Sequence, residues 1–402
     1  MQRLKIKDIN YRAAFGYAFI HFSMEVLCFF FLYEIFGESR LWWSIAVIYD
    51  TIAFAGQVPV GAFCEKHPGF HPGVWGAVLL MSGAAVGIGA KVFSAEEAVL
   101  FRDAGFVTAV FAALLAVSVG NALLHISGAL VTLRASGGRL SECGIFVGGG
   151  AFGVITGRLL GSGTVTISAL RMPKGTDLTF LVPYLLMGIS LILILKLDRI
   201  VFGSKSAGEQ TGAIDKNGGA LEGCGDMSFT KQPCMQDIAA NRPVAAIVLI
   251  LAGVVAVRSY ISNGIPLQWK QTVFETVMLY VAMGIGKMAG GVLSDLFGAR
   301  RTGVVSCLLA VPLLLLGNEH MWISLAGILL FSMTMAIALG GIVSVMPSNP
   351  GVAFGITTFA LFTGTIPVFF MNMPAANVTN ILLAVLSLLS AAGIFATIKD
   401  PD

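Results

Sequence analysis

Two ionisable residues, His21 and Glu25, lie four positions apart in the first long apolar stretch of the sequence. Four residues make about one turn of an α-helix, so the two side chains would share a helix face. An imidazole titrates near neutral pH, and a carboxylate beside it can accept or release a proton. Ionisable groups inside long apolar segments are costly and usually functional, so the pair is predicted to carry a proton, with Asp50 as a further candidate. The alternative is a fixed hydrogen-bonded pair that only ties helices together.

Two cations, Arg258 and Lys287, lie in later apolar stretches where neither side chain easily reaches a polar interface. They could hold an anionic solute in a central cavity, or they could be counter-ions for Glu25 and Asp50. The sequence leaves both interpretations open. Further candidates for lining such a cavity are His125 and Asn263.

These residues require membrane-spanning helices around them. Of the 402 residues, 56% are hydrophobic and only 12% are charged, about half the charged fraction of a soluble domain. Apolar stretches of about 20 residues, long enough to cross the hydrocarbon core of a bilayer, recur along the chain. The net charge is only +3 and the basic residues are scattered, which argues against nucleic-acid binding. The sequence predicts an all-α membrane protein in contact with membrane lipids.

Hydropathy and turn signals predict twelve transmembrane helices, at 12–36, 41–63, 74–93, 103–134, 142–162, 178–197, 244–268, 271–296, 302–317, 321–346, 351–372 and 377–397. The one long connection, 198–243, is rich in glycine, serine and charged residues and is predicted to be a flexible cytoplasmic linker. It divides the chain into an N-terminal six-helix bundle, 1–197, and a C-terminal six-helix bundle, 244–402.

The lysines and arginines predict the orientation of the chain. Most of the 25 fall on one side of the predicted spans, together with the N-terminus. By the positive-inside rule, both termini are expected to be cytoplasmic, in the cytoplasmic membrane of a prokaryotic cell. The six cysteines fall in spans, at their inner ends or in the linker, so we expect no disulfide, metal site or cofactor. A monomer is expected.

A compact charged loop follows the predicted eighth span, with the sequence Gly291-Val-Leu-Ser-Asp295-Leu-Phe-Gly298-Ala-Arg300-Arg301. It combines a glycine for close helix approach, a carboxylate at the membrane face, and a glycine turn before two arginines. This pattern resembles the loop signature of the major facilitator superfamily. The fold implied by that resemblance is two six-helix bundles related by an axis along the membrane normal.

A weaker version of the same pattern, Gly61-Ala-Phe-Cys-Glu65-Lys66, follows the second span. The glycine and the acid of the two loops are each separated by 230 residues, as duplicated halves require. The resemblance implies that Glu65 and Asp295 face the first turns of spans five and eleven, where the helix dipole stabilises a carboxylate. It implies a conformational latch built from both loops: Gly61, Glu65, Lys66, Gly291, Asp295, Gly298, Arg300 and Arg301. The alternative is that the acids are ordinary residues of exposed loops.

The fifth predicted span carries glycines at strict four-residue spacing, which places them on one helix face where a neighbouring helix can approach closely. They are Gly149, Gly153, Gly157 and Gly161. Arg158 lies among them near the outer end of the span. Snorkelling of its long side chain to the interface is as good an account as a role in substrate binding.

Two short stretches are similar to the fosmidomycin-resistance branch of the superfamily: Asn121-Ala-Leu-Leu-His125, and Arg258-Ser-Tyr260 before Gly264. The resemblance implies a secondary active transporter that moves a small solute by alternating access, with proton coupling and efflux of an organic anion or drug expected. The alternative class is a membrane-embedded enzyme that acts on a lipid or isoprenoid. Such enzymes cluster acids and histidines at a membrane face, whereas here the polar residues are dispersed over the spans.

Overall fold

The computed structural model describes residues 11–93, 104–167, 170, 178–202, 238–264, 267–370 and 376–400, and these are almost entirely helical. Among them, eleven helical stretches are long and apolar enough to span a membrane, and Leu181–Leu197 forms a shorter apolar helix. The predicted all-α membrane architecture is confirmed. Residues 203–237 of the predicted linker lie outside the described residues.

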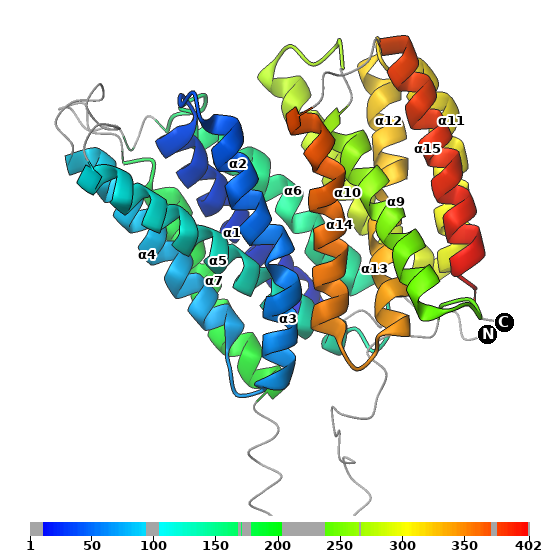
Figure 1. Cartoon of the computed structure of the whole chain (residues 1–402), viewed down its shortest axis with the longest axis horizontal. Coiled ribbons are helices and arrows are strands. Elements are labelled where there is room, and N and C mark those ends of the chain that lie inside the picture. Colours follow the sequence, from blue (N-terminus) through cyan, green and yellow to red (C-terminus); the bar gives the residue numbers. More distant parts are fainter. Residues whose placement is uncertain are drawn as a thin grey trace, which may run out of the picture.

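The first half of the chain contains α1 (Tyr11–Phe36), α2 (Trp42–Asp50), η2 (Thr51–Ala55), α3 (Gln57–Lys66), α4 (Pro72–Phe93), α5 (Ala104–Ala135), α6 (Ser141–Gly161) and α7 (Leu181–Phe202). The second half contains α9 (Val244–Gly264), α10 (Val273–Phe297), α11 (Ala299–Leu316), α12 (Met321–Ser332), α13 (Thr334–Val345), α14 (Pro350–Phe370) and α15 (Ala376–Thr397). These helices form two bundles that lie side by side (Figure 1).

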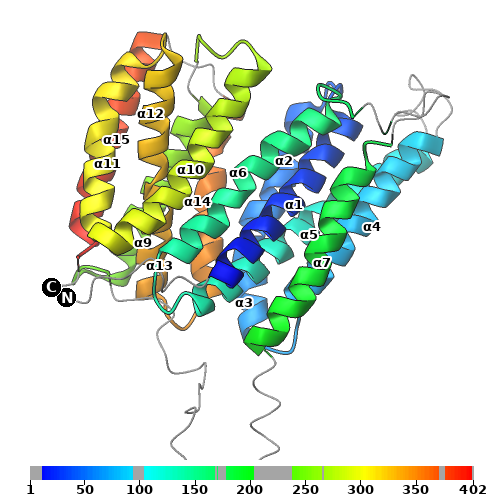
Figure 2. The same ribbon diagram turned by 180° about the vertical axis from the view of Figure 1, so that it is seen from behind.

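The bundles meet at one end and diverge at the other (Figures 1 and 2). We call the end where α1 begins and α15 ends the terminal side, and the opposite end the far side. Backbone bonds attach the segment before α9 to the end of α15: Ala240 N–H donates to Thr397 at 2.8 Å, and Lys399 N–H donates to Ile238 at 2.8 Å. The second bundle therefore begins and ends on the terminal side, and α7, the last helix of the first bundle, ends there as well (Figures 1 and 2).

The predicted second and tenth spans are each interrupted in the structure. Between α2 and α3, Thr51–Ala55 forms a turn of π-helix, a feature that frees backbone carbonyls and often marks functional segments. Side chains satisfy carbonyls nearby: Thr51 donates to Val47 and Gln57 donates to Ala53, each at 2.6 Å. Hydropathy cannot reveal such breaks, because the apolar pattern continues through them.

The glycine stripe of α6 packs against α1, and this pair makes the most extensive contact among the described helices. A Cβ added at any stripe glycine would collide with a backbone carbonyl of α1, contributed in turn by Ala18, Phe22, Val26 and Phe30. These carbonyls are also spaced four residues apart, so the two helices fit along their whole contact. Packing between backbones is an effective way to fix helix pairs in lipid.

Candidate functional site

A cavity of about 630 Å³ lies between the two bundles. It is lined by α1, α2, η2, α5 and α6 on one side and by α9, α10, α13 and α14 on the other. Its lining extends from the buried His21 and Glu25 to Gly37, Trp43 and Phe369 near the far side. The volume is typical of small-molecule sites.

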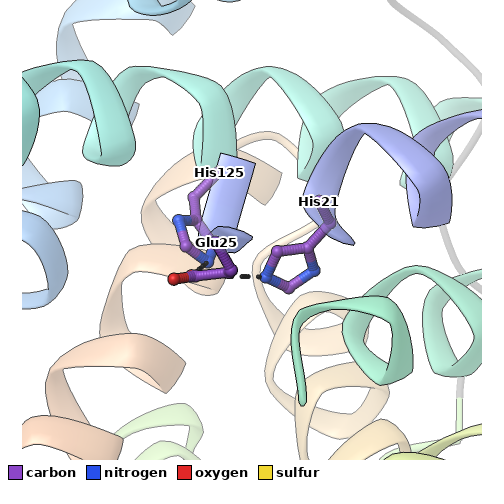
Figure 3. A group of neighbouring side chains, drawn as sticks. All are labelled: His21, Glu25 and His125. Carbon is purple, nitrogen blue, oxygen red and sulfur yellow. Dashed lines mark ion pairs between the residues drawn. The ribbon is translucent and has the colours of Figure 1, made fainter. Parts of the chain in front are cut away.

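The inner end of the cavity is formed by His21, Glu25 and His125, and Figure 3 shows both imidazoles flanking the carboxylate. His21 Nε2 lies 3.7 Å and His125 Nε2 lies 3.5 Å from Glu25 Oε1. All three side chains are buried, and Glu25 Oε2 has no hydrogen-bond partner. The predicted pair is thus a group of three, because α5 brings His125 to the same carboxylate oxygen.

In each imidazole, the Nδ1 atom forms a hydrogen bond to an oxygen. His21 Nδ1 donates to the Phe146 carbonyl at 2.9 Å, and His125 Nδ1 donates to Asn121 Oδ1 at 2.8 Å. A neutral imidazole carries one N–H, so its Nε2 then presents a lone pair toward Glu25. Two lone pairs and a carboxylate oxygen repel one another unless a proton lies between them. The cluster is therefore built to hold at least one proton.

Asn121 connects this cluster to α2. Its amide nitrogen donates to Tyr49 Oη at 3.0 Å and lies 3.5 Å from Glu25 Oε1, while its oxygen accepts from His125. Sequence reasoning placed Asn121 only in a family-like motif and did not identify Tyr49. Asp50, the next residue along α2, also lines the cavity.

Glycine at position 150 makes room for His21. A Cβ there would collide with the imidazole, so Gly150 lets the ring lie flat against α6 within reach of the Phe146 carbonyl. The run Gly148-Gly149-Gly150 thus has separate roles, with Gly149 facing α1 and Gly148 facing Gly284 and Met288 of α10.

Arg258 on α9 and Lys287 on α10 both line the cavity. Arg258 is only 3% exposed, and its Nε and Nη2 atoms have no hydrogen-bond partner. Lys287 Nζ donates to the Val147 carbonyl at 3.4 Å. Among the residues that the structure describes, neither cation lies within the 4.0 Å ion-pair distance of a carboxylate. They are not direct counter-ions of Glu25 or Asp50 in this conformation.

Two further cations line the far-side part of the cavity, Arg158 and Lys270. Arg158 lies over the ring of Tyr33, 5.3 Å from its centroid, a cation–π contact. Its side chain therefore faces the cavity, and this arrangement differs from snorkelling to the lipid interface. The side chain of Asn263 lies outside the described residues.

Asp295 joins α10 to the first turn of α6 on the terminal side. Its carboxylate accepts from Leu140 N–H at 2.9 Å, from Ser141 N–H at 2.8 Å, and from the Ser141 hydroxyl. A Cβ at the nearby Gly291 would collide with the Leu140 carbonyl, so glycine permits this close contact between bundles. Asp295 thus lies at the start of the fifth span, where the resemblance places it.

Glu65 makes the corresponding contact between α3 and the first turn of α14. Its Oε1 accepts from Gly351 N–H at 2.6 Å and from Val352 N–H at 3.3 Å. Gly61 lies directly against the backbone of Gly351. The two halves of the chain therefore make the same contact in both directions, with an acid of one bundle bound at a helix N-terminus of the other.

The basic residues of the loop signatures do not take part in these contacts among the described residues. The Arg300 guanidinium lies 3.6 Å from the ring centroid of Phe395, and Arg301 Nε lies 3.6 Å from Asp400 Oδ2. Both partners belong to the same bundle, because the chain after α15 returns to the start of α11. Lys66 is exposed. Gly298 has a φ of +97° between α10 and α11, and a side chain there would collide with Asp400.

The expectation of no metal site stays a prediction. The ligand atoms of His21, Glu25 and His125 lie within 4.8 Å of one another, close enough to hold an ion. Arg258 and Lys287 line the same cavity, and their charges would oppose a divalent cation there. Among the described residues, Cys28, Cys64, Cys143 and Cys307 are buried thiols that are not part of a disulfide.

Comparison with known proteins identifies the fold of this chain. No family model matches the sequence, and no curated protein sequence matches it. The structure is similar to that of FucP, a major facilitator superfamily transporter in the outward conformation, with a TM-score of 0.54 and 14% identity over 92% of this chain and 97% of that chain. The E. coli fucose:proton symporter FucP gives a TM-score of 0.57 and 12% identity, over 96% of this chain and 98% of that chain.

A bacterial homologue of the iron transporter ferroportin, in an outward-facing state, gives a TM-score of 0.56 and 15% identity over 97% of both chains. Identities this low say nothing about substrate. The shared architecture extends over nearly the whole of each chain, however, so it is not limited to a few helices. The chain is a multi-pass membrane protein with the major facilitator fold.

Proposed function

We propose that the protein is a proton-coupled secondary active transporter that exports a small organic anion or drug by alternating access. Its partners are the solute, protons and membrane lipids, and it acts as a monomer in the cytoplasmic membrane of a prokaryotic cell, with both termini in the cytoplasm. The observation that carries the proposal is the position of the His21–Glu25–His125 cluster. It lies at the inner end of a cavity that both bundles line and that extends to the far side.

The terminal-side contacts support alternating access. Asp295 and Glu65 each bind backbone N–H groups of the opposite bundle, so they stabilise the conformation in which the terminal side is closed. Charge-assisted hydrogen bonds of this kind are strong but reversible. Their release would let the bundles separate on the terminal side and expose the cavity there.

The hydrogen-bond directions in the cluster support proton coupling. Both Nδ1–H groups are already donated to oxygens, so a proton bound by the cluster lies between an Nε2 atom and Glu25 Oε1. The free Glu25 Oε2 offers a second position. One of the similar structures is described as a fucose:proton symporter, which agrees with proton coupling by analogy of fold. Export rests on the resemblance of two short stretches to the fosmidomycin-resistance branch.

The alternative, an enzyme acting on a lipid or isoprenoid, has no specific support. The titratable cluster is enclosed between two bundles that latch reciprocally, an arrangement that serves solute movement. We therefore propose no enzymatic activity.

The test begins with a thermal-shift screen of the purified protein against organic anions, drugs and sugars, because a ligand at 100 times its Kd stabilises by about 2.7 kcal/mol. A stabilising compound is then used in proteoliposomes with an imposed pH gradient. The wild type should accumulate it, whereas Glu25→Gln should lose accumulation but retain exchange, because an amide keeps the shape of a protonated carboxyl and cannot release a proton.

The matched control is Glu34→Gln, on the same helix. Glu34 pairs with Lys91 at 2.8 Å and does not line the cavity, so this variant should accumulate the compound as the wild type does. Accumulation by Glu25→Gln at the wild-type level under the same gradient would refute coupling through the cluster.

A further inference from the structure

Arg258, which lines the cavity, has a guanidinium edge that no group of the described residues uses. Arg258 Nε and Nη2 are both buried and both lack a hydrogen-bond partner. Such a group is costly to keep in a membrane span, and intramembrane charges are normally paired or functional. Both atoms are closed to solvent in this conformation, but Arg258 lines the cavity, so a rotation of its guanidinium would bring the unused edge to a molecule bound there.

The two unused atoms define the shape of that partner. Nε–H and the adjacent Nη2–H lie on one edge of the planar guanidinium and point in nearly the same direction. This edge binds two oxygens of one carboxylate or phosphonate group through parallel hydrogen bonds. A neutral hydroxyl or carbonyl group would satisfy only one of the two.

A second cation, Lys287, lines the same cavity as Arg258. Lys287 is close enough to both Arg258 and Glu25 for their charges to interact, and its ammonium makes a long contact, 3.4 Å, to the Val147 carbonyl. An ammonium has three donors, so donors remain for a ligand. Both cations line the cavity, and neither has a carboxylate within ion-pair distance among the described residues, which favours an anion bound near them.

The other residues that line the cavity determine what kind of ligand body fits there. Leu279, Met283, Leu361 and Phe362 line the cavity from the second bundle, and aromatic residues such as Phe54 and Phe354 line it near the cluster. Apolar and aromatic walls with a few polar groups bind a ligand with an apolar body and one polar end. A strongly hydrated inorganic anion would leave these walls in contact with water.

We propose that Arg258 binds, through its Nε–Nη2 edge, the oxyanion group of an amphipathic organic acid, with Lys287 as the second cation and the apolar walls around its body. This proposal rests on the proposed transport function and names the substrate class of that cavity. A carboxylate and a phosphonate would both fit this edge, because each presents two oxygens on one face.

The test uses three probes with the same phenyl body: 3-phenylpropionate, 2-phenylethylphosphonate and the neutral 3-phenylpropionamide. Their affinities for the full-length purified protein are measured by titration calorimetry and thermal shift at fixed salt. At least one acid should bind roughly 10- to 100-fold more tightly than the amide, the range expected for charge-assisted hydrogen bonds. The acid that binds more tightly identifies the preferred group.

Arg258→Gln should remove this preference, and Arg258→Lys should restore only part of it, because an ammonium lacks the two-donor edge. Arg158→Gln is the comparison variant, because it removes the same charge from another part of the same cavity. Its guanidinium already contacts Tyr33, so the preference for the acid should fall less than in Arg258→Gln. If both glutamine variants lost the preference for the acid equally, the total positive charge of the cavity would account for it. That result would overturn the proposed role of the Arg258 edge.

A structural role for Arg258 predicts a different result. If the guanidinium stabilised the fold, the ligand-free Arg258→Gln protein would have a lower Tm, and the lysine variant would bind acids and amide as the wild type does. We expect the ligand-free Tm to be unchanged or higher, because an unpartnered buried charge is removed. No preference for either acid over the amide in the wild type also refutes the proposal. Proton-driven accumulation of a neutral compound would then leave the transport function intact.

Discussion

Asp295→Asn is the most direct test of the terminal-side latch. The carboxylate accepts three hydrogen bonds at the start of α6, from two backbone N–H groups and one hydroxyl. Asparagine keeps one oxygen acceptor, loses the charge, and places an NH2 group against donors. The substitution therefore removes at least one good bond and weakens the others, and it removes the interaction of the charge with the helix dipole.

The size of the effect follows from these contacts. Hydrogen bonds to charged groups contribute about 1.5–3 kcal/mol each, and the dipole adds up to about 1 kcal/mol near the surface. Asp295 is half-buried, so a net loss of about 2–4 kcal/mol from the closed terminal side is reasonable. That loss shifts the equilibrium between closed and open terminal sides roughly 30- to 700-fold toward the open form.

The assay measures distances between spin labels by pulsed electron paramagnetic resonance. Labels at Gly69, in the loop between α3 and α4, and Ser348, in the loop between α13 and α14, report the separation of the bundles on the terminal side. The native cysteines are replaced beforehand. In Asp295→Asn a longer-distance population should become dominant, while substrate affinity changes by only a few fold and the transport cycle slows.

The matched control is Asp400→Asn. Asp400 also binds the first turn of a helix, accepting from Arg300 N–H at 2.8 Å, but both belong to the second bundle. Its substitution should lower Tm and leave the distance distribution unchanged. A distribution that does not change in Asp295→Asn, or that changes equally in Asp400→Asn, would refute the latch.

Two further predictions concern the other latch and the glycine stripe. Glu65→Gln should shift the same distance distribution in the same direction but by less, because Glu65 accepts two hydrogen bonds and only one of them is short; a shift larger than that of Asp295→Asn would contradict this reasoning. Gly157→Leu should lower the free energy of unfolding by about 3 kcal/mol or more, because its side chain would meet the α1 backbone. The Tm of the purified protein should fall strongly as a result. Gly188→Leu is the control, since a Cβ there meets nothing within 4 Å, and equal Tm losses in the two variants would show that the stripe is not tightly packed.

Much of the fold could be predicted because the bilayer restricts the possible structures. Long apolar stretches must be helices there, so hydropathy locates α5 and α14 within a few residues. The prediction misses the π-turn at Thr51–Ala55 and the division between α12 and α13, because both depend on local backbone bonding. α7 extends to Phe202, five residues beyond the predicted end of its span, because the charged pair Asp198 and Arg199 interrupts the apolar pattern before the helix ends.

The candidate site could be predicted only in part. His21 and Glu25 share a helix, so their proximity follows from spacing alone. His125 reaches the same carboxylate only through the rotation of α5, and Arg158 faces the cavity because α6 is oriented by its contact with α1. Such rotations are set by packing between helices distant in sequence. The contacts of Arg300 with Phe395 likewise depend on where the chain returns after α15, which no local motif specifies.

Helix α6 lies between α1 and α10, and the two contacts differ in kind. Its stripe glycines lie against the α1 backbone over the whole shared length, whereas Gly144 and Gly148 meet α10 near Lys287 and Gly284. The first contact joins helices of one bundle, and the second crosses between bundles. In the proposed rocking motion α6 would travel with α1 as a rigid pair and change its position against α10. The distance from Glu25 to Lys287 would then change with the motion, so the electrostatic field at Glu25 would report which side of the proposed carrier is open.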